Sequence, residues 1–167
     1  MSDTLNLRIP PHSMECEQSV LGGMLMDNGA YDRILGAVGA ADFYRHDHRL
    51  VFEAISRLIE RGKPADTLTV AAELKARGDF DGSALQYLTG LTQATPSTHN
   101  IRRYAEIVRE KAVLRHVVGV GTELADGALS ESANMARVLE DAENKVFELR
   151  QRQLRGGDGI ANRREGR

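Results

Sequence analysis

The spacing of apolar residues predicts that the first 97 residues of the chain form a series of short helices. Apolar residues three and four positions apart share one face of a helix, and this spacing recurs between breaks that contain Gly, Pro or Asp. Ser13 stands where an N-cap residue is favoured, Gly62 stands where a left-handed residue ends a helix, and Gly78 is expected to end the fourth helix. Thr95-Pro96-Ser97 interrupts the pattern. The predicted helices are 14–26, 30–38, 46–61, 68–77 and 84–93.

The last third of the chain is predicted to form two longer helices, at about 98–126 and 133–152. Asp126-Gly127 is expected to end the first helix and Ser132 to cap the second. A short Gly- and Ser-containing turn joins them, which is typical of an antiparallel helical hairpin. The second helix carries apolar residues at alternating spacings of four and three, as in a heptad seam. The two stripes are Val113, Val117, Val120 and Leu124, and Met135, Leu139, Ala142, Val146 and Leu149.

The predicted fold is all-α: a compact bundle of about five helices followed by a long antiparallel helical hairpin. Leu85, Leu88 and Leu91, with Tyr87 as a further candidate, are expected to form the buried stripe of the fifth helix. Thr67–Val70 alternates as a strand does, but the run is short and merges into helical spacing, so no strand is predicted. The expected segments are an N-terminal arm (1–12), a globular bundle (13–97), the hairpin (98–152) and a linker or disordered tail (153–167).

Composition and charge narrow the class of protein. The chain has 41% hydrophobic and 28% charged residues and no Trp, which fits a soluble globular protein with an aliphatic core. It has one Cys, no signal-peptide pattern and no run of about 18 to 20 apolar residues, which predicts a cytoplasmic protein without a membrane span. The net charge is −2, although six Arg residues lie between 150 and 167. The folded part is therefore acidic, which argues against DNA binding as its main role.

Motifs for catalysis, nucleotide binding or metal binding are not found in the sequence. No Gly-x-x-x-x-Gly-Lys-Ser/Thr loop occurs, and the Gly-rich segment 156–159 lacks the Lys that such a loop needs. His46 and His48 are two positions apart, so on a helix they point away from each other and are expected to form a polar helix start. We therefore predict no catalytic, cofactor-binding or metal-binding residue in this chain.

A DNA-reading helix is a further possibility for 98–115, which carries five basic side chains. Glu106 and Glu110 lie among these residues at helical spacing, which is typical of a solvated face with ion pairs between successive turns. The basic residues are Arg102, Arg103, Arg109, Lys111 and Arg115.

The two apolar stripes of the hairpin suggest a protein interface. If the two helices of one chain do not cover both stripes, an apolar patch remains exposed, and such patches usually mark an interface. The symmetric solution is a two-fold dimer with the hairpins side by side. The alternative is that the stripes pack on the globular part of the same chain. The candidate interface residues are Val113, Val117, Val120, Leu124, Met135, Leu139, Ala142, Val146 and Leu149.

An ordered set of short motifs resembles a known family. The set begins with Pro10-Pro11-His12-Ser13 and the run 15–23, and continues with Asp42-Phe43-Tyr44, the run 62–66 and Thr95-Pro96-Ser97. It ends with Asn100-Ile101, Tyr104-Ala105, the run 107–110 and Arg115. In order and spacing the set is similar to the N-terminal domain of DnaB-type replicative DNA helicases, from about residue 9 to about residue 150. The segment from about 154 onward departs from that family's pattern.

The resemblance implies a role in assembly. Members of the family are hexameric rings that unwind DNA, and ATP and Mg²⁺ bind in a C-terminal motor domain that would lie outside this chain. Their N-terminal domains pair through the hairpins into a trimer of dimers and dock the primase. The implied partners are a second copy of the chain and primase, with DNA contacted only through the complete ring. A free-standing helical adaptor of the primosome and a helical DNA-binding protein are the alternative hypotheses.

The resemblance also suggests roles for individual residues. Glu15 and Tyr87 are the candidate primase contacts. Their alternative roles are a first-turn acid that interacts with the helix dipole and an ordinary half-buried core Tyr. A further polar set is expected to cap helices and tie loops, namely Asp42, Arg49, Asp66 and Asn100.

Overall fold

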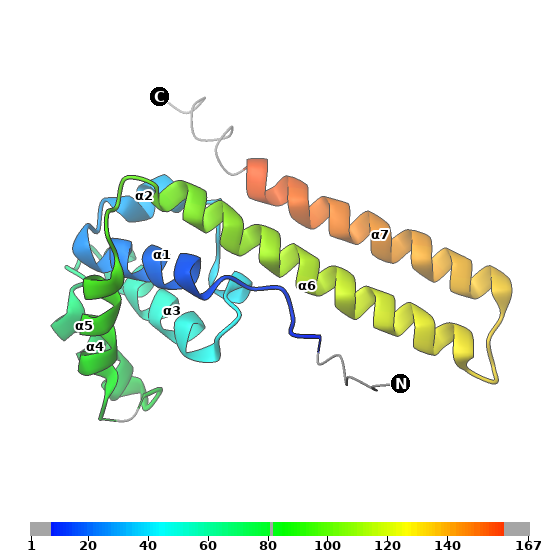
Figure 1. Cartoon of the computed structure of the whole chain (residues 1–167), viewed down its shortest axis with the longest axis horizontal. Helices are drawn as coiled ribbons and strands as arrows, with labels where there is room; N and C mark the ends of the chain where they lie inside the picture. Colours follow the sequence, from blue (N-terminus) through cyan, green and yellow to red (C-terminus); the bar gives the residue numbers. More distant parts are fainter. Residues whose placement is uncertain (1–7, 81, 159–167) are drawn as a thin grey trace, which may run out of the picture.

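The structure is a computed structural model that describes residues 8–80 and 82–158; for 154–158 it describes only the helical backbone. Within these ranges there are seven α-helices and no β-strand, which confirms the predicted all-α fold. Figure 1 shows a globular part, here called the head, from which a long helical hairpin projects. No helix in the described ranges is long and apolar enough to cross a membrane. The helices are α1 (Met14–Met26), α2 (Ala30–Ile34), α3 (His46–Glu60), α4 (Thr67–Arg77), α5 (Ala84–Ala94), α6 (Ile101–Leu129) and α7 (Met135–Asp158).

The capping residues set several helix boundaries as the sequence predicts. The Ser13 side chain accepts a hydrogen bond from the Cys16 amide at the start of α1. Asp66 accepts one from the Thr69 amide at 2.8 Å, and the Thr69 hydroxyl accepts one from the Asp66 amide at 2.9 Å, which completes a capping box. Gly62 and Gly78 have φ of +70° and +69°, the left-handed conformation that a helix end favours.

Other boundaries differ from the prediction. Helix α2 ends at Ile34 rather than near 38, because Leu35 is extended and Gly36 has a φ of +82°. Helix α6 continues through Gly127 to Leu129, since an exposed helical Gly costs only about 1 kcal/mol relative to Ala. Helix α7 begins at Met135, and Asn134 rather than Ser132 caps it by accepting from the Arg137 amide at 3.2 Å.

The ends of the predicted segments are described only in part. Helix α7 extends through Asp158, so 153–158 is helical where a linker or tail is predicted. The remaining residues of that segment, 159–167, and residues 1–7 of the predicted arm lie outside the described part of the chain.

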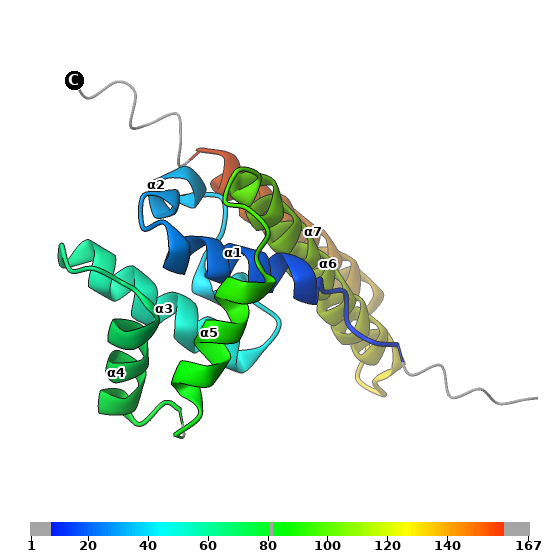
Figure 2. The ribbon, with the colours of Figure 1, turned by 60° about the vertical axis from the view of Figure 1, so that its left-hand side comes forward.

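The core of the head is aliphatic and continues into the first half of α6. Helix α1 packs against α3, α5 and α6, and α4 contacts both α3 and α5 at the edge of the head (Figure 2). Leu21, Met24, Ile34, Ile55 and Leu74 are fully buried in one cluster. The same cluster includes the residues of α6 that face α1 and α2, namely Ile101, Ala105 and Val108. The predicted segment boundary at 97/98 falls before α6, whereas buried side chains continue to Ala112.

The fifth helix is rotated slightly from the predicted orientation. Leu88 and Leu91 are buried as expected, and Ala84 is buried with them. Leu85, by contrast, is 42% exposed, so its prediction as a core residue is wrong. Three consecutive turns place Ala84, Leu88 and Leu91 on the face toward α1 and α4, and Leu85 lies beside that face.

Helices α1 and α5 approach each other closely at Gly22. A Cβ atom at this position would lie 1.9 Å from Thr95 Oγ1 and 2.5 Å from the backbone oxygen of Leu91. Because real Cβ atoms do not come this close to other heavy atoms, only glycine fits here without a shift of α5. This crossing fixes the relative positions of Gln18 on α1 and Tyr87 on α5.

Candidate interaction surfaces

Glu17, His48 and Tyr87 form a hydrogen-bonded network that joins α1, α3 and α5. The Glu17 carboxylate is 1% exposed and accepts hydrogen bonds from the Tyr44 amide at 2.9 Å and from the Arg45 amide at 3.4 Å. His48 is fully buried; its Nδ1 lies 2.8 Å from Glu17 Oε1, and its Nε2 hydrogen bonds with the Tyr87 hydroxyl. The buried carboxylate therefore satisfies two amides that precede α3 and orients the imidazole.

The network corrects the prediction for His46-Asp47-His48. His46 is exposed and His48 is buried, so the two imidazoles do point away from each other, but His48 belongs to the core and not to a polar helix start. Among the residues that the structure describes, no group of three or more His, Cys, Asp or Glu side chains could hold a metal ion. Sequence reasoning missed Glu17, whose position in the first turn of α1 is typical of a solvated acid.

A shallow groove runs along α5 beside Tyr87. It has a volume of about 470 Å³, and its lining includes Gln18, Gln86, Tyr87, Gly90 and Ala94. Burial raises the pKa of the Tyr87 hydroxyl, and the guanidinium of Arg45 lies 5.7 Å from the centre of the Tyr87 ring. Tyr87 therefore has a ring in the groove and a hydroxyl in the buried network.

The structure brings the two candidate primase contacts to one side of the head. Glu15 is exposed on α1, one turn before Gln18, so both side chains lie on the same face of that helix. Gln18 lines the groove beside Tyr87, so Glu15 lies at the end of α1 that is adjacent to this groove. Tyr87 is half-buried, which is compatible both with a contact role and with a structural one.

The root of the hairpin is tied to the head and to the N-terminal arm. Arg115 on α6 donates hydrogen bonds to the carbonyl oxygens of Pro11 at 2.7 Å and Asp42 at 2.6 Å, and its guanidinium lies over the ring of Tyr44. The Asp42 carboxylate accepts from Arg109 at 2.8 Å and from the Gly39 amide at 2.7 Å. These contacts hold Pro11 of the N-terminal arm and the loop at Asp42 against α6.

Three of the four polar residues expected to tie loops do so. Asp42 and Asp66 make the contacts described above, and Arg49 Nε donates to the carbonyl oxygen of Phe43 at 2.8 Å. Asn100 precedes α6 but makes no side-chain capping hydrogen bond.

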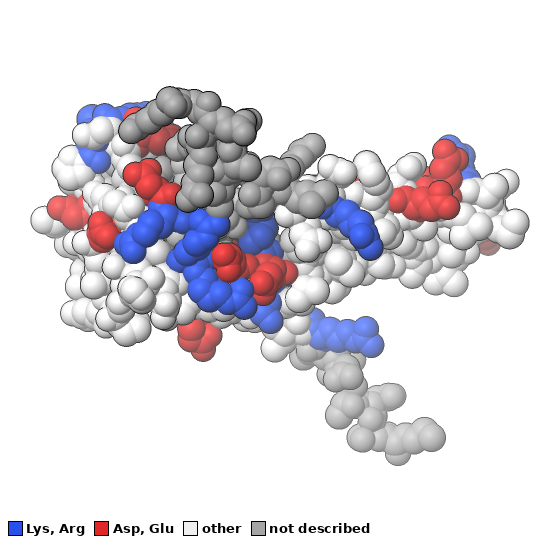
Figure 3. All heavy atoms as spheres, turned by 90° about the horizontal axis from the view of Figure 1, so that it is seen from above, with Lys and Arg blue, Asp and Glu red and all other residues white. Residues whose placement is uncertain are grey.

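The exposed face of α6 has mixed charge. Arg102 pairs with Glu106 at 3.4 Å, and Arg103 pairs with Glu106 at 3.4 Å and Glu110 at 3.1 Å. Figure 3 shows basic side chains gathered on the side of the molecule that carries the start of α6, with acidic side chains among them. The carboxylates compensate Arg102 and Arg103, as expected of a solvated face with ion pairs between successive turns.

The hairpin divides the candidate interface residues into two sets. Helix α7 packs mainly on α6, and Val113, Val120, Leu124, Ala142 and Leu149 are half-buried along the two helices. The other four are exposed: Val117 (45%), Met135 (79%), Leu139 (57%) and Val146 (50%). Sequence reasoning missed four further exposed apolar side chains on the hairpin, Leu114, Val118, Leu129 and Phe147. The spacing of Leu114 and Val118, one turn apart, is the signal that could have found two of them.

Comparisons with known proteins agree with this architecture. Residues 9–110 match the model of the DnaB-like helicase N terminal domain family. The chain is 38% identical over 161 residues to the replicative DNA helicase DnaB of Haemophilus influenzae, covering 95% of this chain and 34% of that protein. The DnaB of Geobacillus stearothermophilus is 36% identical over 157 residues, covering 93% and 35%. The chain thus spans about a third of the length of these relatives.

Two solved structures are similar in fold. The crystal structure of the N-terminal domain of DnaB helicase from Mycobacterium tuberculosis has a TM-score of 0.78 and 39% identity, covering 84% of this chain and 99% of that one. The structure of a DnaB-like replicative helicase, described with its interactions with primase, has a TM-score of 0.65 and 18% identity, covering 82% and 31%. At that identity the second likeness shows the fold alone. The chain belongs to the family of DnaB-like helicase N-terminal domains.

Proposed function

We propose that this chain is the self-association and primase-docking domain of a replicative helicase. The complete protein would be a cytoplasmic ring that unwinds DNA, with ATP and Mg²⁺ bound in a motor domain outside these residues. The domain would pair with a second copy through the hairpin and would offer the head to primase. The observation that carries the proposal is the set of apolar side chains left uncovered along α6 and α7.

The uncovered side chains favour self-association. Leu139 and Val146 lie on one side of α7, two turns apart, and Val117 is exposed on the neighbouring α6. Burying one such side chain stabilises a complex by about 1.5 to 3 kcal/mol. A two-fold dimer with the hairpins side by side would bury these side chains in both copies. One symmetric interface would then cover the projecting hairpin of each chain.

The location of the interface is tested with two charge substitutions on α7. Leu139→Asp should reduce the dimer association constant by about 100-fold or more, since it removes apolar burial and introduces an unpaired charge. Asn144→Asp is the matched control, because Asn144 is exposed on the opposite side of α7 and the new charge is the same. Sedimentation equilibrium measures both variants. A Leu139→Asp variant that associates as tightly as Asn144→Asp would place the interface elsewhere.

The groove beside Tyr87 supports the docking part of the proposal. A half-buried aromatic ring next to polar side chains is typical of a protein-contact site, since it offers area together with hydrogen-bonding groups. Gly90 leaves open space in this groove, with no atom within 4 Å of the position that a Cβ would occupy. A larger side chain there would fill the groove without touching the core.

Primase docking is tested with Gly90→Leu and Glu15→Lys, measured by calorimetric titration with primase. Each should weaken binding, the first by filling the groove and the second by reversing a charge at its edge. Glu53→Lys on α3 is the matched control, because Glu53 is exposed and does not line the groove. Unchanged affinity in both test variants would exclude this groove as the primase contact. Loss of primase binding with the dimer intact would separate the two parts of the proposal.

A further inference from the structure

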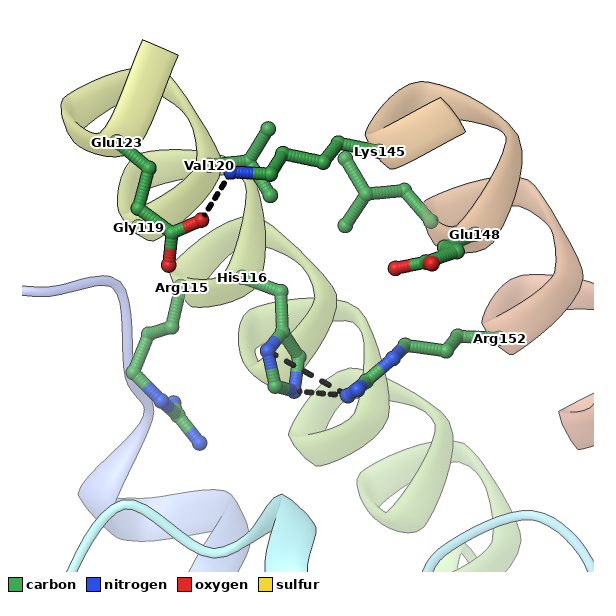
Figure 4. A pocket seen from close by; sticks show the side chains of 9 residues that line it. Arg115, His116, Gly119, Val120, Glu123, Lys145, Glu148 and Arg152 are labelled. Carbon is green, nitrogen blue, oxygen red and sulfur yellow. Dashed lines mark hydrogen bonds and ion pairs between the residues drawn. The ribbon is translucent and has the colours of Figure 1, made fainter. Parts of the chain in front are cut away.

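The α6–α7 crevice is a hollow of about 250 Å³ at the root of the hairpin. Figure 4 shows side chains from both helices directed into it. A second hollow of about 200 Å³, lined also by Asp42 and Arg109, shares His116 and Arg152 with the first. The charged and titratable side chains of the crevice are Arg115, His116 and Glu123 of α6 and Lys145, Glu148 and Arg152 of α7.

Charge is distributed unevenly along the crevice. Toward the tip of the hairpin, Lys145 Nζ lies 2.6 Å from Glu123 and also interacts with Glu148, so this end is compensated. Toward the head, Asp42 is paired with Arg109 at 2.8 Å. The remaining cations at the head end are Arg115 and Arg152.

Arg115 and Arg152 hydrogen bond to neutral acceptors. Arg115 donates to two backbone carbonyl oxygens, and Arg152 donates to His116 Nε2 at 2.9 Å. Within residues 8–80 and 82–153, no carboxylate lies within 4 Å of either guanidinium. Among the described side chains, these two guanidiniums at the head end of the crevice make no ion pair, and Glu148, one turn before Arg152, is the nearest carboxylate along α7.

His116 responds to this positive charge. Because Arg152 donates to its ring, the imidazole must accept with a lone pair, which requires the neutral form. Partial burial lowers the pKa of His116, and Arg152 and Arg115 lower it further, while Asp42 opposes them. A bound anion would favour the imidazolium and so add a third positive group to the site.

We propose that the head end of the α6–α7 crevice, formed by Arg152, His116 and Arg115, binds a small phosphate-bearing anion. Arg152 is exposed and able to turn its planar guanidinium from the imidazole toward phosphate oxygens, with which it forms paired hydrogen bonds. His116 would take up a proton from solvent as the anion binds. Inorganic phosphates and the phosphates of a nucleotide share this chemistry.

The crevice contains none of the four exposed candidate interface residues, although two of the half-buried candidates, Val120 and Leu149, line it. Gly119 lines the crevice, whereas Val117 is exposed on the hairpin. These residues are two positions apart on α6 and therefore about 200° apart around its axis. The crevice thus opens on the side of the hairpin away from Val117, and the inference does not depend on self-association or on primase docking.

The experiment follows the His116 ring signals of the complete chain by NMR. Inorganic phosphate, pyrophosphate and adenosine 5′-diphosphate are titrated at constant ionic strength, maintained with NaCl. His116→Gln assigns the signal, and circular dichroism verifies the fold of each variant. We expect a saturable shift and a rise in the pKa of His116. Tighter binding of the diphosphate nucleotide than of pyrophosphate would identify a nucleotide as the source of the phosphate, and equal binding would identify free phosphates.

The matched variants are Arg152→Gln and Arg137→Gln. The first should weaken binding about tenfold or more, because it removes a charge-assisted hydrogen bond. The second should bind as the unsubstituted chain does, since Arg137 is exposed on α7 about 22 Å along the helix from Arg152. No saturable shift with any of the three anions, a shift that NaCl alone reproduces, or equal binding by Arg152→Gln would overturn the proposal.

Discussion

The close crossing of α1 and α5 predicts that Gly22→Ala destabilises the head. The new Cβ would lie 1.9 Å from Thr95 Oγ1 and 2.5 Å from the Leu91 carbonyl oxygen, so side-chain rotation alone cannot make room. Thr95 is buried, and its hydroxyl donates to that same carbonyl at 2.8 Å, so the contact also strains a hydrogen bond. Helix α5 would have to move away from α1.

The expected change in the free energy of unfolding of Gly22→Ala is the sum of two opposing effects. Overpacking of this kind costs about 1 to 3 kcal/mol or more. Ala is favoured over Gly inside a helix by about 1 kcal/mol, which offsets part of the cost. At a site with an atom at 1.9 Å we expect the steric effect to dominate, with a net loss of about 2 kcal/mol in the free energy of unfolding. For a chain of this size that loss lowers Tm by about 4 to 8 °C.

Gly90→Ala is the matched control, since Gly90 lies in α5 with no atom within 4 Å of its Cβ position. This variant should be more stable by about 0.5 to 1 kcal/mol, the opposite sign from Gly22→Ala. Urea unfolding followed by circular dichroism measures both, and an unchanged m-value indicates the same change in exposed surface. Equal stability of Gly22→Ala and the unsubstituted chain would refute the close crossing.

Three further predictions concern the other contacts. Glu17→Gln should lower the free energy of unfolding by about 2 kcal/mol in urea titrations, because a buried charged acceptor is lost; full stability would mean that His48 and the amides do not depend on the carboxylate. Arg115→Ala should lower the backbone order parameters of Ile9 and His12 measured by ¹⁵N relaxation, and unchanged values would show that the arm is held by other contacts. The lowered pKa of folded His116 means that the unfolded chain binds more protons, so the His116 contribution to stability falls as the pH drops through about 6.5. Unfolding midpoints of His116→Gln should lack this contribution, and an identical pH profile in both proteins would contradict it.

Local capping explains why most helix boundaries could be predicted from the sequence. Ser13, Asp66 and Gly78 act on amides and carbonyls within a few residues, so their effect is visible in a short window. The largest exception is α2, whose end depends on the positive φ of Gly36, a choice that glycine permits but does not require.

Long-range burial explains what the sequence did not reveal. Glu17 and His48 are 31 positions apart, and only the packing of α1 on α3 makes one the partner of the other. Within the sequence of its own helix, each of the two residues is of a type that usually lies on a polar surface. The orientation of α7 on α6 also depends on long-range packing. The heptad pattern predicts an apolar stripe but not which of its members face α6. Leu149 is half-buried and Leu139 is exposed, although both belong to that stripe.

Self-association through the hairpin is tested most directly by the molar mass of the chain in solution. Light scattering after size-exclusion chromatography, over a range of protein concentrations, gives this mass without assumptions about shape. The account predicts twice the chain mass of 18.4 kDa, or an even multiple of it, at the higher concentrations. A mass of 18.4 kDa at every concentration would contradict it, because the exposed side chains of Leu139 and Val146 would then remain in water.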